Sequence, residues 1–154
     1  APFFIRYPRE YLPTYQTIRH LPLNYGQWLT THQSKNKKLA MISFGPILND
    51  IFKAIEHEAL DVTLINAVYQ KPIDEGMLES LLPYDHIIIH QAYSVEQGFV
   101  SKVKDWFMKR NYQGKIETLV IPDAFITQAS ISEQMASCGV DVKSVIQTVK
   151  NHLK

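Results

Sequence analysis

The chain has 154 residues, 45% of them hydrophobic and 20% charged, and its formal net charge is +1. This length suits one domain with a real core, and so small a net charge provides no electrostatic basis for binding nucleic acid or an anionic membrane. No stretch is long and apolar enough to span a bilayer. The single cysteine excludes an internal disulfide or a Cys-rich metal site, which fits a cytoplasmic protein.

Residues 1–36 lack the regular apolar spacing of the rest of the chain. Phe3–Tyr7 is expected to be the end of a strand, stopped by Pro8. From there to Tyr25, prolines and tyrosines without a period indicate an extended segment lying over a surface. Gln27–Thr31 is predicted to be a short edge strand. Because the sequence opens inside an apolar run and without an initiator Met, we expect it to be part of a longer protein.

The stretch from Lys38 to Ala59 predicts a strand followed by an amphipathic helix. Leu39–Phe44 is a short apolar run that ends at Gly45-Pro46, which indicates a buried strand closed by a turn. Beyond the turn, isoleucines recur at every fourth position and polar residues fall between them, which is the spacing of a helix with one buried face. A strand that passes into a helix in this way is the first half of a βαβ unit.

The rest of the chain continues this alternation. The predicted elements are a strand over Asp61–Val68, a helix from Asp74 to Leu82, a strand over His86–His90, a helix over Gly98–Asn111, a strand over Glu117–Ile121, and helices over Ile131–Cys138 and Val142–Leu153. Asp74 and Ser130 are the predicted N-caps of two of these helices, and Glu133 has capping-box spacing from Ser130. Because strands this apolar need cover on both faces, we predict an α/β fold, a three-layer α/β/α sandwich with a mainly parallel sheet.

The residues that often carry chemistry are weak candidates here. Neither Gly45 nor Gly98 belongs to a nucleotide-binding glycine motif. His86 and His90 lie four apart in a predicted strand, on one face but too far apart to be neighbours, so we interpret them as histidines at strand ends near solvent rather than metal ligands. Cys138 has no basic residue close in sequence, and we interpret it as a small core or boundary residue rather than a nucleophile.

One short motif has a clearer chemical meaning. Arg6-Tyr7-Pro8-Arg9 places two arginines around an aromatic residue at a predicted strand end. A guanidinium presents a planar fork of donors that suits a phosphate group. Arg6 is therefore a candidate for phosphate binding, although most such arginines are surface residues or ion-paired.

Four segments of the chain occur in an order found in a known family. They are Arg6-Tyr7-Pro8-Arg9, Ser43-Phe44-Gly45, Lys71-Pro72-Ile73-Asp74, and Pro122-Asp123-Ala124-Phe125-Ile126 followed by Ser130, Glu133, Gly139 and Asp141. In this order they resemble the C-terminal part of 1-deoxy-D-xylulose-5-phosphate synthase. The last segment is the most specific match, because the Lys-Pro-hydrophobic-Asp motif is shared with transketolases and with the β subunits of 2-oxoacid dehydrogenases. The resemblance covers nearly the whole chain, least well over residues 10–36.

This resemblance implies a domain organisation. Residues 1–36 would be the tail of a preceding pyrimidine-binding domain plus a linker, and residues 37–154 would be a transketolase-like C-terminal domain. That domain has a five-stranded mixed sheet with one antiparallel strand, which would suit Gln27–Thr31. The domain would pack on the preceding domains of the same protein, extend the interface of a homodimer and wall one side of the active-site entrance.

The resemblance also implies an activity for the complete protein. The synthase joins pyruvate and glyceraldehyde 3-phosphate on thiamine diphosphate with magnesium, and its product feeds isoprenoid, thiamine and pyridoxal synthesis. Because the first two domains hold the diphosphate, the magnesium and the aminopyrimidine ring, this chain alone is expected to bind neither cofactor and to be inactive. Arg6 matches a phosphate-facing arginine of the family and is the one site residue expected here; no catalytic, cofactor or metal residue is expected.

The chain departs from the family pattern in two places. A second arginine that helps to hold the substrate phosphate falls at Val68, and valine cannot replace a charge-assisted donor. The family's Glu-Glu-Asn segment and the glycine turn after it correspond to Gln91-Ala92-Tyr93 and Gln97-Gly98-Phe99-Val100, where only Gly98 and the aromatic residue survive. These departures leave an alternative open: a non-catalytic interaction module like the C-terminal domain of 2-oxoacid dehydrogenase β subunits. A stand-alone receiver- or flavodoxin-like domain is disfavoured, because a phosphate loop and an acidic cluster are both missing.

Overall fold

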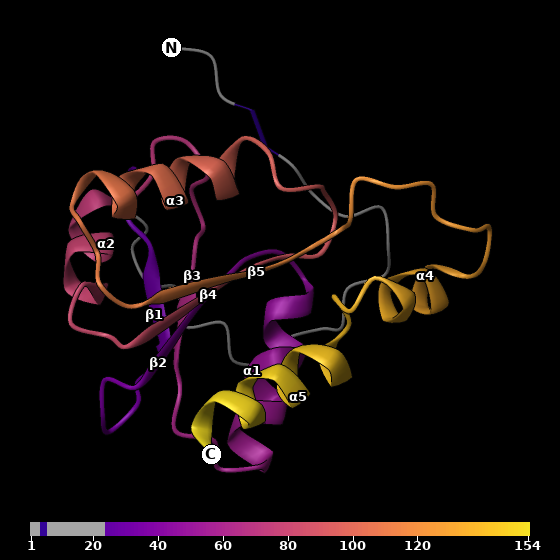
Figure 1. The fold of residues 1–154 in the computed structure, drawn as a ribbon, viewed down its shortest axis with the longest axis horizontal. Coiled ribbons are helices and arrows are strands. Elements are labelled where there is room, and N and C mark those ends of the chain that lie inside the picture. Colours follow the sequence, from indigo (N-terminus) through magenta and orange to yellow (C-terminus); the bar gives the residue numbers. More distant parts are fainter. Residues whose placement is uncertain (1–3, 6–23) are drawn as a thin grey trace.

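A five-stranded sheet lies between two layers of helices. The computed structural model describes residues 4–5 and 24–154. Its elements are β1 (Leu29–His32), β2 (Leu39–Ser43), α1 (Ile47–His57), β3 (Thr63–Asn66), α2 (Glu75–Leu81), β4 (His86–Gln91), α3 (Phe99–Lys109), β5 (Lys115–Val120), α4 (Ile131–Ser137) and α5 (Val142–Leu153). Figure 1 shows α2 and α3 on one face of the sheet and α1 and α5 on the other. This arrangement confirms the predicted three-layer α/β/α sandwich.

The sheet is mixed, as expected. Its strand order is β1-β3-β2-β4-β5. Strands β2 to β5 are parallel to their neighbours, whereas β1 runs antiparallel to β3. The antiparallel strand lies at Leu29–His32, close to the predicted Gln27–Thr31, and its register shifts between Thr30 and His32. Strand β1 belongs to the same sheet as the other four strands. The domain boundary expected after residue 36 stays a prediction.

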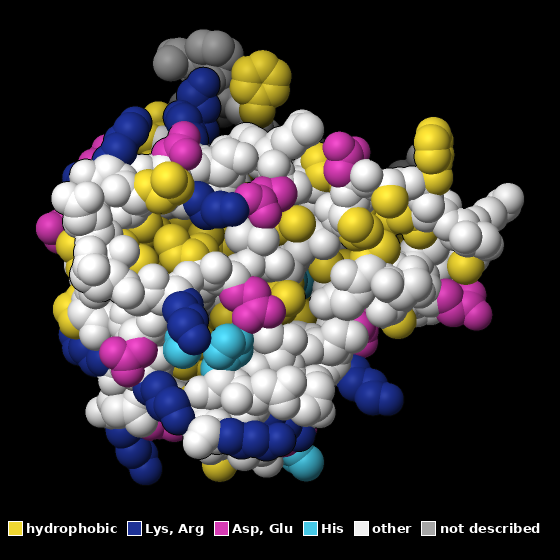
Figure 2. Space-filling model, viewed as in Figure 1, with side chains coloured by type: hydrophobic (Ala, Val, Ile, Leu, Met, Phe, Trp, Pro, Cys, Tyr) yellow, Lys and Arg dark blue, Asp and Glu magenta, His cyan; other side chains and the backbone are white. Residues whose placement is uncertain are grey.

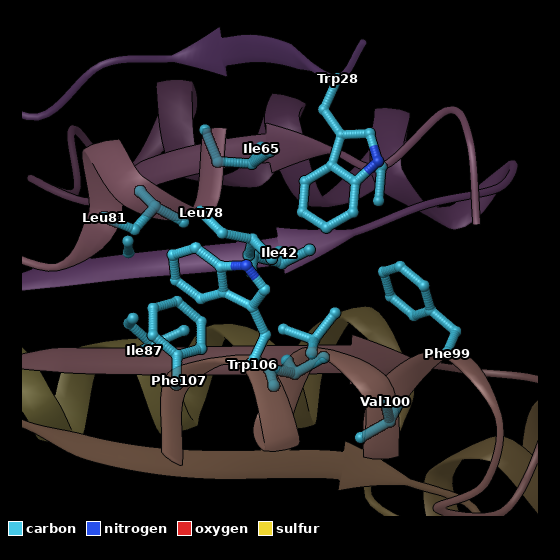
Figure 3. Close-up of a cluster of buried hydrophobic side chains, with 14 of the residues drawn as sticks. Trp28, Ile42, Ile65, Leu78, Leu81, Ile87, Phe99, Val100, Trp106 and Phe107 are labelled. Carbon is cyan, nitrogen blue, oxygen red and sulfur yellow. The ribbon is translucent and has the colours of Figure 1, made fainter. Parts of the chain in front are cut away.

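Two apolar cores fill the spaces between the layers. The core under α2 and α3 contains Trp28, Trp106 and Phe107, and Figure 3 shows their rings packed with isoleucines of β2, β3 and β4. The core under α1 and α5 is aliphatic, with Ile51, Ile55 and Val145 among its members. Each large side chain that is fully buried contributes roughly 1.5–3 kcal/mol. These two cores are what allow the chain to fold around its sheet.

Helix boundaries follow the local capping residues. The Asp74 side chain accepts a hydrogen bond from the Met77 amide, and Ser130 with Glu133 forms a capping box, so both predicted N-caps are confirmed. The first helix ends at His57 rather than Ala59, because Ala59 has a left-handed backbone with φ 50°. None of the described helices is long and apolar enough to cross a membrane.

Helix α4 differs from the others because none of its residues is buried. It lies on a projection beside the sandwich, reached by the segment that follows β5 (Figure 1). Phe125 on this segment is fully exposed, and Ile131 of α4 is 61% exposed. Figure 2 shows hydrophobic side chains at several points of the projection. From Ile116 to Val142 the sequence has four acidic residues and no Lys or Arg.

Candidate functional site

The loops at the carboxyl ends of the parallel strands form the candidate site. These strands end at Ser43, Asn66, Gln91 and Val120. From β2 the chain crosses to β3 on one side and then to β4 on the other side, so the connections diverge between β2 and β4. Open α/β sheets bind ligands at the carboxyl edge near such a point.

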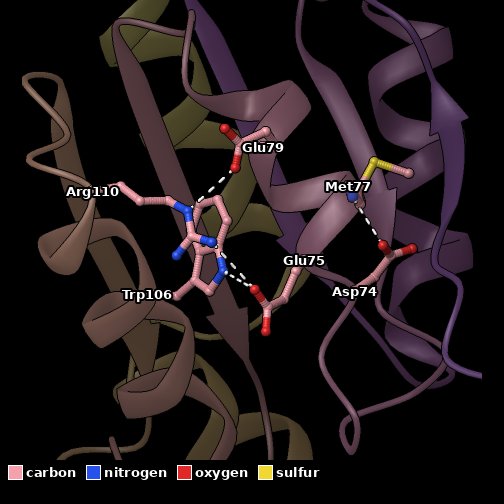
Figure 4. Close-up of polar contacts among 6 residues, drawn as sticks. All are labelled: Asp74, Glu75, Met77, Glu79, Trp106 and Arg110. Atoms are coloured by element: carbon pink, nitrogen blue, oxygen red, sulfur yellow. Dashed lines mark hydrogen bonds and ion pairs between the residues drawn. The ribbon is translucent and has the colours of Figure 1, made fainter.

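The Lys71–Asp74 motif is held against the segment before β1. Asp74 Oδ2 accepts a hydrogen bond of 2.7 Å from the Trp28 amide. Its Oδ1 accepts one of 2.9 Å from the Met77 amide, which Figure 4 shows. The Trp28 indole in turn donates to the Tyr69 carbonyl at 2.7 Å. One carboxylate thus caps α2 and fixes Trp28, while Trp28 fixes the loop that precedes the motif. We refer to this set of contacts as the Asp74–Trp28 clamp.

A close backbone contact supports the same clamp. Gly26 has φ +78°, and a Cβ atom there would lie 3.1 Å from Cγ of Pro72. Glycine is suited to this position because it adopts a left-handed backbone without strain and leaves room for the proline. The clamp therefore joins the segment around Trp28 to the Lys-Pro-Ile-Asp motif by both hydrogen bonds and packing.

Val68 lies at the carboxyl edge, in the loop that the clamp fixes. Its side chain is 38% exposed, and its amide donates to the Asn66 carbonyl at 3.0 Å. The next residue in this loop is Tyr69, whose ring meets the Tyr25 ring edge to face, with centroids 5.6 Å apart. The position that was expected to lack a phosphate-binding arginine is thus an exposed apolar side chain that precedes Tyr69 in the sequence. Arg6, the predicted phosphate-binding residue, lies outside the described residues.

Buried hydrogen bonds link strands β2 and β4 to the Val140 carbonyl. Ser43 Oγ lies 2.8 Å from His90 Nδ1, and His90 Nε2 lies 3.0 Å from the Val140 carbonyl oxygen. Because a carbonyl only accepts, Nε2 of the neutral ring carries the proton and Ser43 donates to Nδ1. Ser43 and His90 are both fully buried. Burial lowers the pKa of His90 to about 4, against a smaller upward effect of the Val140 carbonyl.

The interpretation of His90 as a strand-end residue near solvent is therefore wrong. His90 belongs to the core, where it connects β2 and β4 to the turn between α4 and α5. The signal was present in the sequence, because alternate positions of an apolar strand share a face and Ile88 and Ala92 also pack toward α1 and α5. This pair is closed to solvent, so it holds the fold together rather than offering a nucleophile.

His86 occupies a different environment at the other end of β4. Its ring packs on His152 with centroids 4.7 Å apart, and His152 Nε2 lies 2.6 Å from Glu117 Oε2. Neither ring nitrogen of His86 has a partner among the described residues. Burial, followed by the nearby His152 and Lys115, lowers the pKa of His86. The two histidines of the strand are therefore separate features, as expected from their spacing.

The other candidates have structural roles. Cys138 is half-buried at the end of α4 and packs against the aliphatic core, as its interpretation as a boundary residue requires. Glu75 accepts hydrogen bonds from Trp106 Nε1 at 3.1 Å and from Arg110 Nη2 at 3.2 Å (Figure 4). Arg110 also lies 3.7 Å above the Trp106 ring. Within residues 4–5 and 24–154, no three His, Cys, Asp or Glu side chains are arranged to hold a metal ion.

Comparison with known proteins gives a consistent match. The family model described as "Transketolase, C-terminal domain" matches residues 26–145. The chain is 32% identical to 1-deoxy-D-xylulose-5-phosphate synthase of Parabacteroides distasonis over 97% of its own length and 24% of that protein. It is 32% identical to the Porphyromonas gingivalis synthase over 99% of its length and 25% of that protein. The chain thus spans about a quarter of the length of the curated relatives that it matches.

More distant relatives and one solved structure extend the comparison. The Thermotoga maritima synthase is 30% identical over 100% of this chain and 25% of its own length. A split-gene transketolase, solved as an inactive tetramer of the "beta4" type, superposes with a TM-score of 0.71 at 18% identity. That superposition covers 92% of this chain and 46% of the other chain. The likeness to this structure concerns the fold.

Proposed function

The chain belongs to the transketolase C-terminal domain family, and on this basis we propose that it is the C-terminal domain of a 1-deoxy-D-xylulose-5-phosphate synthase acting in the cytoplasm. In this role the domain is architectural. It packs on the preceding domains of its own polypeptide and extends the interface of a homodimer. The observation that carries the proposal is the alignment with these synthases over 97% of the chain or more, at 30–32% identity.

Two structural features support an architectural role. The Asp74–Trp28 clamp fixes the segment that leads into the domain. A preceding domain would therefore be joined to this one through a segment held in a defined position. The projection that carries α4 exposes Phe125 and Ile131, which are large apolar side chains that a neighbouring domain would cover. A domain with these features is suited to docking on a larger protein.

In the complete protein, the preceding domains would bind thiamine diphosphate and magnesium. The cofactor supplies the carbanion chemistry when it is bound. This chain would contribute Arg6, whose guanidinium would bind the phosphate of glyceraldehyde 3-phosphate. Val68 provides no second donor, so we expect the enzyme to hold this phosphate less tightly than a synthase with two arginines.

The direct test is an assay of the complete gene product. Purified protein with thiamine diphosphate and magnesium should convert pyruvate and glyceraldehyde 3-phosphate to 1-deoxy-D-xylulose 5-phosphate, detected by NMR. Arg6→Ala should raise the KM for glyceraldehyde 3-phosphate by about tenfold or more, because it removes a charge-assisted contact. Val68→Arg should lower the same KM. Arg110→Ala is the matched control, because the Arg110 guanidinium forms ion pairs with Glu75 and Glu79 of helix α2.

One observation favours a second candidate function. The carboxyl edge is lined by the exposed Val68 and the Tyr25–Tyr69 pair, and such an apolar, aromatic surface suits a protein contact. On this alternative the domain is a non-catalytic interaction module of the kind in 2-oxoacid dehydrogenase β subunits. A complete protein that binds no thiamine diphosphate and forms no product, yet assembles through this domain, would favour the module over the synthase.

A further inference from the structure

Within residues 4–5 and 24–154, the outer edge of β5 is open for hydrogen bonding. Strand β5 pairs with β4 on one side, and in the described part of the chain no strand pairs with its other side. The Lys115 amide donates to the Asp85 carbonyl at 2.9 Å, and the Ile121 amide donates to the Ser94 carbonyl at 3.1 Å. Because backbone groups alternate along a parallel strand, the N–H and C=O groups of Ile116, Thr118 and Val120 point away from β4.

The two edges of the sheet are built differently. At the opposite edge, β1 has four residues and a register shift between Thr30 and His32, which are features that block further pairing. By contrast, β5 has six residues paired with β4 in unbroken register, and Ile116–Val120 are all partly exposed. In Figure 1 the strand runs between α3 on one side and α5 on the other. An edge of this kind is a template for another strand.

The sequence of β5 is complementary to itself in one register. In an antiparallel pair centred on Thr118, the outward-facing residues pair as Ile116 with Val120 and Thr118 with Thr118 of a second copy. All three outward-facing residues then exchange hydrogen bonds across the two-fold axis. A pair centred on Glu117 instead places that carboxylate opposite its own copy and leaves Val120 outside the paired strand, and like charges directly opposite destabilise a sheet.

On the face toward α2 and α3, the side chains in this register also match. Ile116 and Val120 contact the core under α2 and α3, so their pairing across the axis would continue that apolar layer into the second copy. Thr118 Oγ1 donates to Glu96 at 2.7 Å, which holds its side chain on the same face. Cross-strand pairs of β-branched residues stabilise a sheet. Of the flanking carboxylates, Glu96 pairs with Lys104 and Glu117 lies against His152 Nε2, both within the same copy.

We propose that two copies of this chain associate through antiparallel pairing of their β5 strands centred on Thr118, so that the two five-stranded sheets become one continuous sheet. This contact rests on β5 alone and is independent of whether the complete protein is a synthase. The helices α3 and α5 of each copy then flank the same axis on opposite faces. The partner at this edge is a second copy of the chain.

Cysteine cross-linking tests the register. In a Cys138→Ser background, Thr118→Cys should form a disulfide-linked dimer under mild oxidation, because Cα atoms of a hydrogen-bonded antiparallel pair lie about 5.5 Å apart. Ile116→Cys is the matched control and should stay unlinked, because its two copies would lie roughly 13 Å apart along the strands. Mixed Ile116→Cys and Val120→Cys chains should link to each other. No linkage at position 118, or equal linkage at 116, would overturn the proposal.

A proline substitution tests the edge without relying on oxidation. Thr118→Pro removes a donor that points away from β4, so the fold should survive, as far-UV circular dichroism can check. The dimer dissociation constant, measured by analytical ultracentrifugation of the 154-residue chain, should rise by at least about tenfold. Ile116→Pro should act in the same way. A chain that is monomeric before substitution, or a dimer that keeps its affinity in both variants, would contradict the inference.

Discussion

His90 shows how a single buried side chain couples the stability of this domain to pH. The neutral ring accepts from Ser43 and donates to the Val140 carbonyl, and burial lowers its pKa to about 4. The unfolded chain would bind a proton near the ordinary histidine value of about 6.5. Between these two values the unfolded state binds more protons than the folded state, so acid favours unfolding.

We therefore expect the free energy of unfolding to be nearly constant above pH 6.5 and to fall as the pH drops toward 4. The loss from His90 should total about 3 kcal/mol, and it should level off below the folded pKa. Urea titrations at pH 7.5, 5.5 and 4.5 measure it. In His90→Gln this component should vanish, whereas His57→Gln, which alters an exposed histidine, should keep it. An unchanged acid slope in His90→Gln would refute the assignment.

Asp74 shows a different use of one side chain, because its two oxygens receive two backbone amides from different parts of the chain. The N-cap was predictable from the sequence, because Asp74 precedes a run of apolar residues with helical spacing. The bond to Trp28 was not, because the two residues are 46 positions apart and nothing local connects them. Local chemistry predicts caps, whereas contacts between distant segments depend on the assembled fold.

Asp74→Ala should lower the free energy of unfolding by about 2 kcal/mol, since it removes a cap and leaves the Trp28 amide without its acceptor. Amide hydrogen exchange at Trp28 should accelerate at the same time. Asp50→Asn is the control, because Asp50 is exposed and pairs with Lys53 on the surface. If Trp28 keeps its protection in Asp74→Ala, the clamp is not formed as described.

At the scale of elements, apolar spacing explains most of what was predictable. Helix α3 and helix α5 lie where the spacing of their apolar residues placed them, and the strands shift by a few residues at most. Strand β3 ends at Asn66 rather than Val68, because the Val68 amide turns back to the Asn66 carbonyl. The exact end of an element depends on such local bonds, which apolar spacing does not encode.

Gly114 lies in a tightly packed turn, whereas Gly76 lies in the uncrowded first turn of helix α2. At Gly114, between α3 and β5, a Cβ would lie 2.5 Å from the Asp85 carbonyl oxygen and would also collide with Tyr112. Gly114→Ala should therefore destabilise the fold by about 2 kcal/mol, as overpacking does. Gly76 in α2 has only an ordinary contact of 3.5 Å at this position, so Gly76→Ala should stabilise by about 0.5 kcal/mol. Thermal unfolding of both variants checks the opposite signs, and destabilisation of equal size in both would contradict the packing.

At the scale of the whole molecule, the alternation of strands and helices led to the correct layers, and the family resemblance led to the single antiparallel strand. The order β1-β3-β2-β4-β5 did not follow from alternation alone, because the same elements can be arranged in more than one order. The candidate site was harder to predict. Arg6 lies outside the described residues, and the buried Ser43–His90 pair joins strands whose adjacency only the fold reveals.

We propose that this domain supports a thiamine-diphosphate enzyme without binding the cofactor itself. Isothermal titration of thiamine diphosphate with magnesium, into this 154-residue chain and into the complete gene product, tests it directly. We predict no binding heat with the chain and saturable binding, at one cofactor per polypeptide, with the complete protein. Binding by the chain unaided, or none by the complete protein, would contradict the account.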